Sequence, residues 1–406
     1  MIQKLIHRIL LRRHFWRYAT FSEIAELYSS RLLRMMALHI VASFMSIYLY
    51  QIGYSVLFIA GFWAVFFALK AILSLPAAAI TAWIGPKHAI LLSNILYIPS
   101  MIAFALVPQF GVSALVVVLL FKAISIPLYS IAYMADFSKV KSFDHAGKEI
   151  AIMNIIEKLT AGLSPLIGGL LAFAFGPSVV MIMAAVLFAL SAAPLLATAE
   201  QVSPRKKLNF KGFAWHLVRP VSVAHFAVGF DVFTSGTVWS LFYAIFIIGI
   251  ASSNEVYAVS GLLSSVVLFA ALASSYAYGL LIDRRKGREL LVISTIVNAL
   301  THASRPFTNS AVNVAGLNVA NEAATTGYMM AYNRAIFDNA DLSGQRVAYL
   351  GVLEVIANIG ATAAAVVLML LIAPFGDQSA LQTLFFITAA VALLVLTARF
   401  PLYRKK

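Results

Sequence analysis

Long apolar segments separated by short polar ones fill most of the chain. Gly, Pro and charged residues mark the segment ends, and the segments reach the roughly 20 residues that an α-helix needs to cross a bilayer. Because backbone polar groups in hydrocarbon must be hydrogen-bonded within the segment, such runs predict helices. We predict an all-α integral membrane protein with twelve transmembrane helices, near residues 32–53, 55–82, 88–107, 111–135, 150–174, 178–198, 223–249, 256–282, 289–307, 311–334, 347–373 and 380–400.

The longest polar stretch in the interior divides the predicted helices into two sets of six. It reads AEQVSPRKKLNFKGFAWHLVRP. Such a break in the apolar pattern predicts a cytoplasmic linker at residues 200–222. The chain is therefore expected to form an N-terminal six-helix bundle at residues 31–199 and a C-terminal six-helix bundle at residues 223–406.

Residues 1–30 follow a different pattern. Apolar residues such as Ile2, Ile6 and Ile9 recur at helical spacing, with Arg8 and other basic residues between them. This pattern predicts a basic amphipathic arm that lies on an anionic membrane surface. A disordered basic tail is the alternative.

The composition supports a chain embedded in lipid. It is 62% hydrophobic and 11% charged, whereas soluble domains carry roughly 25% charged residues. The net charge of +14 does not indicate nucleic-acid binding, because the basic residues gather at the predicted helix ends. The absence of cysteine excludes disulfides and thiolate chemistry.

The basic residues also predict the orientation. All but four of the 30 Lys and Arg residues lie on one side of the predicted spans, and loops rich in these residues stay in the cytoplasm. The exceptions are Lys70, Lys122 and Lys158 inside spans and Arg305 at the opposite edge. We therefore expect a multi-pass protein of the cytoplasmic membrane with both termini in the cytoplasm.

The two halves repeat one another weakly. The segment YMADFSKVKSFDHAGKEIAIMNIIEKL parallels YMMAYNRAIFDNADLSGQRVAYLGVLEVI. Aligning Gly147 with Gly344 places Glu157 opposite Glu354, each near the cytoplasmic end of the fifth helix of its half. Paired six-helix halves of this kind are a transporter architecture.

A loop motif follows the eighth predicted helix. It reads GLLIDRRKGREL and contains Gly279, Leu281, Asp283, Arg284, Gly287 and Arg288. It resembles the GxLaDrxGrk signature of the major facilitator superfamily, with one extra residue between Asp283 and Gly287. Glycine lets neighbouring helices approach closely, and arginines hold the turn at the anionic cytoplasmic surface.

Two further segments bear on this resemblance. The matching loop of the first half, AAAITAWIGPKHAI, keeps Gly85 and Lys87 but has Ala82 at the aspartate position. The stretch GLSPLIGG in the fifth helix is similar to a Gly-Pro-Gly-Gly pattern of antiporters in the family. It predicts a closely packed helix, as glycines do in many membrane proteins.

Charged residues at bilayer depth require an explanation, because each costs at least about 2.5 kcal/mol to insert. In the family fold, the first, fourth, seventh and tenth helices line a central cavity. The resemblance therefore implies that Lys122 and Glu322 face one cavity from opposite halves. Our hypothesis is that Glu322 takes up the coupling proton and that Lys122 pairs with it or binds an anionic group of the solute. A permanent structural ion pair, or a lysine that snorkels, is the alternative.

Other polar residues in the spans are secondary candidates for the same cavity. Asn318 and Asn321 share a helical face with Glu322. Asp231 is a second carboxylate candidate, with a structural bridge to a basic loop as the alternative. His39 is a further candidate, because histidine is the side chain whose ordinary pKa lies near neutral pH. A lone histidine in a span is more often a packing residue, and Lys70 is open to the same two interpretations.

The resemblance also implies a cytoplasmic gate. Carboxylates at the positions of Glu157 and Glu354 pair with basic loop residues in related transporters. We therefore expect Glu354 to bind Arg284 or Arg288, and Glu157 to bind Lys87. The gate would comprise Gly279, Asp283, Arg284, Gly287, Arg288, Glu354, Glu157 and Lys87.

These features favour a monomeric secondary transporter that moves a small organic solute by alternating access. We expect it to be driven by the proton gradient, with export or antiport slightly favoured, and to need no cofactor or metal. A lipid or lipid-linked-sugar flippase, or a non-transporting receptor or scaffold, is the alternative. An enzyme is disfavoured, because none of the eight histidines begins an HExxH motif and the carboxylates are dispersed. An ATP-driven pump is disfavoured too, because the chain has no GxxxxGK[ST] loop.

Overall fold

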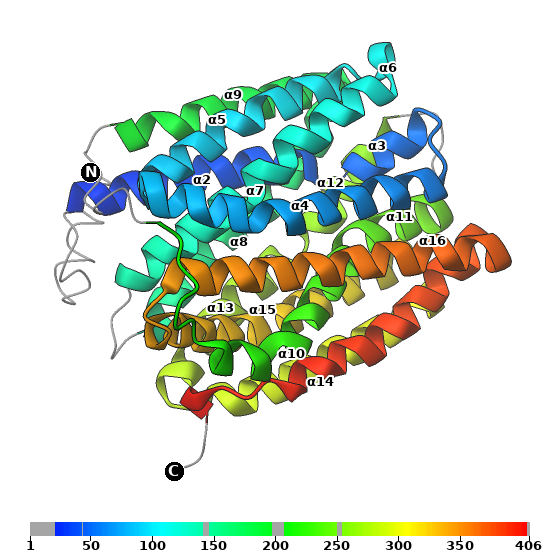
Figure 1. The fold of residues 1–406 in the computed structure, drawn as a ribbon. Coiled ribbons are helices and arrows are strands. Elements are labelled where there is room, and N and C mark those ends of the chain that lie inside the picture. The colour runs from blue at the N-terminus through cyan, green and yellow to red at the C-terminus, as the bar shows by residue number, and fades with distance from the viewer. Residues whose placement is uncertain (1–20, 43, 141–145, 197–206, 250–253, 404–406) are drawn as a thin grey trace.

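The computed structural model describes residues 21–42, 44–140, 146–196, 207–249 and 254–403. Within these ranges every regular element is a helix. Long helices run side by side through the molecule, and both ends of the described chain lie at the same end of the bundle (Figure 1). The predicted amphipathic arm falls on residues 1–30, of which residues 1–20 lie outside the described residues.

The first half of the chain, up to Leu196, forms the elements that the apolar pattern predicts, with most boundaries shifted by only a few residues. They are α2 (Phe21–Ala42), α3 (Met45–Gln51), α4 (Val56–Ile84), α5 (Pro86–Ala105), α6 (Val107–Phe110), α7 (Val112–Val140), α8 (Ala146–Phe175), α9 (Pro177–Ala192) and the 3-10 turn η1 (Ala193–Leu196). The exception is the first helix, which begins at Phe21 instead of residue 32. Arg31 and Arg34, which we counted among the basic residues on the cytoplasmic side, therefore lie buried inside the bundle.

The second half begins with α10 and also follows the predicted order. Its elements are α10 (Trp215–Phe233), the π-helix η2 (Thr234–Val238), α11 (Trp239–Tyr243), the π-helix η3 (Ala244–Ile248), α12 (Glu255–Ser265), α13 (Leu268–Asp283), α14 (Gly287–Ser304), η4 (Arg305–Phe307), α15 (Ala311–Leu342), α16 (Arg346–Ala392), η5 (Leu393–Thr397) and η6 (Pro401–Tyr403). The helix α16 covers two predicted spans and turns between them. The turn lies at Gly376, two residues after Pro374, where the backbone adopts a φ of 70°.

Nine segments of the described chain are long and apolar enough to cross a membrane. One of them, Arg346–Thr397, contains the turn at Gly376 and so corresponds to two predicted spans. The helices α14 and α15 lie outside this set, and their predicted spans carry more polar residues. An all-helical membrane protein is thus observed, while the number twelve stays a prediction.

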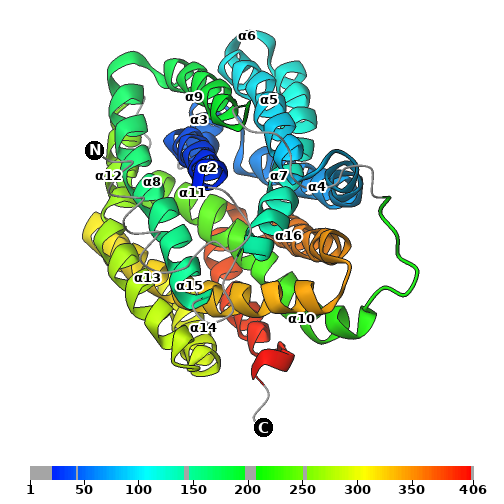
Figure 2. The same ribbon diagram turned by 90° about the vertical axis from the view of Figure 1, so that its left-hand side faces the viewer.

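The two chain halves pack along each other through helices on opposite sides of the molecule. On one side α4 lies along α16, and on the other α8 lies against α12 and α13 (Figure 2). Small residues bring these helices close together. A Cβ added at Gly169 would lie 2.3 Å from the backbone oxygen of Tyr257, and one added at Gly351 would lie 2.8 Å from the Cβ of Ala78. The predicted close packing of the GLSPLIGG segment thus occurs between the halves at Gly169 and within the first half at Gly168, whose added Cβ would lie 2.0 Å from the backbone oxygen of Ile40.

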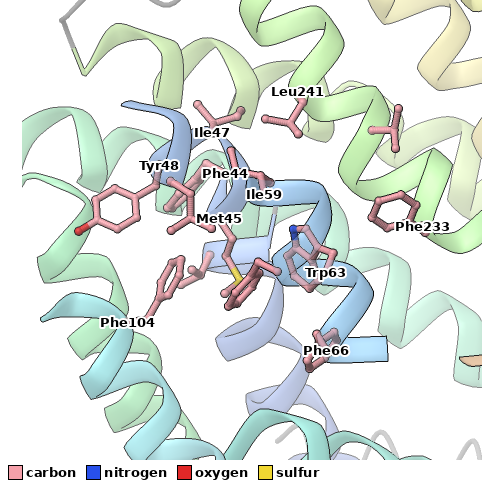
Figure 3. Packing of buried hydrophobic residues seen from close by; sticks show 14 of the residues in the cluster. Phe44, Met45, Ile47, Tyr48, Ile59, Trp63, Phe66, Phe104, Phe233 and Leu241 are labelled. Carbon is pink, nitrogen blue, oxygen red and sulfur yellow. The ribbon is translucent and has the colours of Figure 1, made fainter. Parts of the chain in front are cut away.

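Buried aromatic side chains join the two halves. Phe44 of the first half meets Tyr257 edge-on with ring centroids 5.1 Å apart, and Phe67 meets Phe233 at 5.9 Å. Figure 3 shows this cluster, with Met45, Trp63 and Phe66 on one side and Phe233 on the other. Dispersion contacts of this kind hold helices together in lipid. Met45, Trp63, Phe66 and Phe67 also line the cavity described next.

Candidate functional site

A cavity of about 520 Å³ lies between the two halves. Six of the residues that we predicted from sequence line it, namely His39, Lys70, Lys122, Asn318, Asn321 and Glu322. A second cavity, of about 470 Å³, lies toward the N-terminal end of α2 and includes Arg31 and Glu157 in its wall. The two cavities adjoin, because they share the lining residues Leu38, Phe67, Lys70, Ile126 and Val232.

Lys122 on α7 is buried among sulfur and aromatic groups. Its amine lies 3.1 Å from the sulfur of Met45 and 4.8 Å and 5.3 Å from the ring centroids of Trp63 and Phe66. These groups attract a cation weakly. In the described part of the chain, no carboxylate forms an ion pair with Lys122. The pairing with Glu322, one of the two roles that we considered for Lys122, is therefore not formed in this structure.

Glu322 on α15 pairs with Lys158 on α8 instead. The amine of Lys158 lies 2.7 Å from the carboxylate, which also accepts a hydrogen bond from the hydroxyl of Thr326 at 3.0 Å. Both charged side chains are about one-fifth exposed. Because α8 belongs to the first half and α15 to the second, this ion pair bridges the halves.

Glu354 on α16 forms a second bridge between the halves. Its carboxylate lies 3.7 Å from the amine of Lys70 on α4 and accepts a hydrogen bond from Ser130 at 3.0 Å. The expected partners Arg284 and Arg288 are exposed at the loop. Glu354 lies eight residues inside α16, about 12 Å from its first residue, and lines the second cavity. This corrects the predicted contact with the loop arginines.

Glu157 and Lys87 also have other partners than we expected. Glu157 pairs with Arg31 at 2.6 Å, and Lys87 pairs with Glu26 at 2.9 Å. The guanidinium of Arg31 also lies 3.8 Å from the ring centroid of Tyr133. The early start of α2 explains both differences, because it brings Glu26 and Arg31 into the bundle as partners that the sequence pattern had placed outside.

The loop with the family signature is a helix end with regular geometry. The amides of Lys286 and Arg285 donate to the carbonyls of Leu281 and Ile282, which is the Schellman pattern that closes a helix. Arg285 occupies its left-handed position, with φ of 63°. The extra residue between Asp283 and Gly287 thus belongs to this turn.

The glycines of the same loop serve close packing. Gly279 is buried within α13, and Gly287 is the first residue of α14. A Cβ at Gly287 would lie 2.7 Å from the hydroxyl oxygen of Tyr403. The loop therefore holds the C-terminal segment through Gly287 and leaves its arginines at the surface.

Asp231 on α10 lies beside the main cavity in a buried polar network. Its carboxylate accepts hydrogen bonds from Tyr328 at 2.5 Å, Ser235 at 2.8 Å and Asn298 at 2.9 Å. It also lies 2.6 Å from the Nε2 of His302. Of these residues, Ser235 also lines the main cavity. All five belong to the second half, so this network is not a bridge to the first.

Arg305 extends the network and determines the protonation of His302. Its guanidinium lies 2.9 Å from the Nδ1 of His302. A guanidinium can only donate, so Nδ1 accepts, and the proton on Nε2 points to Asp231. Arg305 also donates to Asn321 at 3.0 Å and lies over the ring of Trp239. His302 is therefore neutral, with the carboxylate of Asp231 on one side and the guanidinium of Arg305 on the other.

Sequence reasoning missed His302, Tyr328 and the role of Arg305. One signal was available, because Asn298, His302 and Arg305 follow one another at spacings of four and three residues and so share a helical face. A polar stripe in an apolar helix indicates polar contacts with neighbouring helices.

We expect Asp231→Asn to destabilise the folded protein. The substitution removes the charge that accepts four hydrogen bonds, and bonds to a charged group each contribute about 1.5 to 3 kcal/mol. The midpoint of thermal unfolding in detergent, followed by tryptophan fluorescence, should fall clearly. Glu289→Gln, at an exposed position on α14, is the control and should leave it unchanged. An equal midpoint for both variants would show that the network is energetically unimportant.

The structure is similar to several solved transporters. These include a POT family transporter in complex with 5-aminolevulinic acid (15% identity, 92% of this chain and 95% of that chain, TM-score 0.69). The human organic anion transporter MFSD10 has 13% identity, 91% and 99% coverage and a TM-score of 0.68. The E. coli fucose:proton symporter FucP, a Major Facilitator Superfamily transporter, has 15% identity, 92% and 97% coverage and a TM-score of 0.66. No family model and no curated protein sequence matches the chain.

Proposed function

Since the chain has the fold of Major Facilitator Superfamily transporters, we propose that it is a secondary active transporter for a small organic solute. The observation that carries this proposal is a cavity between the halves whose charged walls come from both of them. A fold of two packed halves around such a cavity supports alternating access, in which the halves rock about a fixed site. The transporter would act as a monomer in the cytoplasmic membrane, with both termini in the cytoplasm.

Two ion pairs would control the rocking. Lys158 with Glu322 and Lys70 with Glu354 each join a lysine of the first half to a glutamate of the second. When the halves separate at these points, each pair must break or find a replacement. An unpaired charge at this depth costs about 2.5 to 3.5 kcal/mol or more, so a proton or a charged solute that replaces one partner favours the movement.

The coupling proton would bind to Glu322. A protonated carboxyl group no longer needs Lys158, so proton uptake would release the bridge between α8 and α15. Glu322 also lines the main cavity beside Asn318 and Asn321, and the solute and the proton would therefore reach it along one path. We favour export by antiport, because the GLSPLIGG segment in the fifth helix is similar to the pattern of antiporters in the family.

The solute would bind Lys122 through an anionic group. Lys122 has only soft partners, namely the sulfur of Met45 and the rings of Trp63 and Phe66. A carboxylate would therefore be a better partner than any that the lysine has now. The related folds include an organic anion transporter and a transporter that holds 5-aminolevulinic acid. Both names agree with an organic acid as the solute class.

Proteoliposomes with a trapped pH-sensitive dye provide the test. A panel of small organic acids is added under an imposed pH gradient, and solute-dependent proton movement is recorded. We expect at least one acid to move protons, and Lys122→Gln to weaken its apparent affinity about tenfold or more, which corresponds to at least about 1.4 kcal/mol of lost binding. Lys211→Gln, at an exposed position, is the matched control and should behave as the unaltered protein.

Two results would contradict the proposal. Protein that is folded in the liposomes but gives no solute movement or exchange with any acid would favour a receptor or scaffold. Transport with the same affinity in Lys122→Gln as in the control would remove Lys122 from the solute site while leaving the transporter assignment in place.

A further inference from the structure

The charged residues around the two cavities are not balanced. Eight charged side chains of the described chain line these cavities, five of them cationic and three anionic, namely Arg31, Arg34, Lys70, Lys122, Lys158, Glu157, Glu322 and Glu354. Each glutamate has its own cation, because Glu157 pairs with Arg31 and the other two form the bridges between the halves. Two positive charges therefore remain, Lys122 in the first cavity and Arg34 in the second.

Arg34 is a buried cation without a carboxylate partner among the residues described. It is 1% exposed, and one of its nitrogens donates to the amide oxygen of Asn94 at 2.5 Å. Its guanidinium carbon lies 3.9 Å from the ring centroid of Tyr129, and its Nε has no hydrogen-bond partner. The ring centroids of Tyr97 and Phe188 also lie 5.6 Å and 5.4 Å from the guanidinium carbon. Aromatic faces attract the charge but do not accept the Nε–H, so the guanidinium keeps unused donor capacity.

The two unpaired cations lie at different levels of the bundle. Tyr129, which contacts Arg34, follows Lys122 by seven residues on α7, and seven residues of helix span about 10 Å. Five residues line both cavities, namely Leu38, Phe67, Ile126 and Val232, which are apolar, and Lys70, which is paired with Glu354. The path from one unpaired cation to the other therefore has mainly apolar walls, and the charge of Lys70 along it already has a partner.

From this arrangement we propose that the transported solute is an organic dianion that carries its two anionic groups at the ends of an apolar body. One group would bind Lys122, and the other would bind the free edge of the Arg34 guanidinium, which suits the two oxygens of a carboxylate. The inference rests on the proposed transport function and adds both the charge of the solute and Arg34 as a binding residue.

The electrostatic balance of the cavities supports a solute with two negative charges. Burying an uncompensated cation costs several kcal/mol even after the protein relaxes. A monoanion would leave one of the two cations unpaired when the cavity closes. A dianion would balance both, so the loaded protein would close more readily than the empty one. Exchange of one dianion for another should therefore be faster than net movement.

Binding of carboxylates to the purified full-length protein tests the proposal. Its thermal stabilisation is measured with succinate, adipate, suberate and sebacate, and with hexanoate and octanoate as singly charged controls. We expect dicarboxylates to bind about tenfold or more tightly than monocarboxylates of equal length, the difference that one added ion pair of about 1.4 kcal/mol gives. Affinity should peak at the chain length that spans the two cations.

Variants of Arg34 identify the second contact. In Arg34→Gln the preference for dicarboxylates should disappear while octanoate binds as before, and in Arg34→Lys, which keeps the charge, much of the preference should remain. If Arg34→Gln does not fold, Arg34→Lys and the chain-length series still test the proposal. Equal binding of octanoate and suberate to the unaltered protein would overturn it.

The outcomes separate this inference from the proposed function. Transport of monocarboxylates in liposomes without any dicarboxylate preference would refute the dianion and leave the transporter intact. Movement of no acid of either kind would refute the transport function itself. A dicarboxylate preference that Arg34→Gln keeps would refute the role of Arg34.

Discussion

Proton-driven transport should fall to background in Glu322→Gln, while exchange of solute across the membrane continues. The amide cannot take up or release a proton, but it keeps the size of the side chain and can still accept a hydrogen bond from Thr326, which now donates to the carboxylate at 3.0 Å. Solute binding at Lys122 does not involve this group. Uptake driven by a pH gradient and counterflow without a gradient, measured in the same liposomes, distinguish the two activities.

The substitution also leaves Lys158 without its partner at bilayer depth, which costs about 2.5 to 3.5 kcal/mol on insertion scales. The double variant Lys158→Gln with Glu322→Gln controls for this effect. It should recover thermal stability without recovering proton-driven transport. Unchanged pH-driven transport in the single variant would rule out Glu322 as the proton site. Loss of exchange as well would indicate that Glu322 acts in solute binding.

A single added methyl group at Gly169 should disrupt the contact between the halves. In Gly169→Ala the new Cβ would lie 2.3 Å from the backbone oxygen of Tyr257, and the facing Gly261 is equally tight against the oxygen of Pro165 at 2.4 Å. Overpacking costs about 1 to 3 kcal/mol even where side chains can move, and here the obstacle is backbone. We expect a lower yield of folded protein, a lower melting temperature and loss of transport.

Gly316→Ala is the matched control, because Gly316 is also helical and nothing lies within 4 Å of the position that its Cβ would occupy. Alanine is favoured over glycine in a helix by up to about 1 kcal/mol, so this variant should be as stable as the unaltered protein or slightly more. Gly169→Ala with the stability and transport rate of Gly316→Ala would show that α8 and α12 do not stay in close contact in the membrane.

Most helices were predictable because hydropathy is a local property. A run of apolar residues in lipid must form its own hydrogen bonds, whatever surrounds it, and the predicted ends of most spans differ from the observed ones by a few residues. The start of α2 is the main exception. Glu26 and Arg31 look like solvent-exposed residues in the sequence, and their burial depends on partners at Lys87 and Glu157 that lie far away in the chain.

The contacts within the candidate site were much less predictable. The resemblance implied that Lys122 and Glu322 face one cavity, and both line it. Their pairing, one of the two roles considered for Lys122, rested on opposite charge alone, and Glu322 pairs with Lys158 instead. Pairing depends on how far each helix is rotated and shifted against its neighbours, and no spacing within one helix contains that information. For the same reason the sequence did not reveal that Glu354 pairs with Lys70 and not with Arg284 or Arg288.

The apolar and polar pattern of the chain was enough to identify a helical membrane protein and to locate the lysines and glutamates inside its spans, because the cost of inserting a charge depends on the residue alone. The partner of each charge followed from helix packing, since pairing needs two groups from distant parts of the chain within about 4 Å. Helix packing places a cationic side chain beside each of Glu157, Glu322 and Glu354. It left Lys122 and Arg34 without a carboxylate in the described part of the chain, and the proposed solute site rests on those two residues.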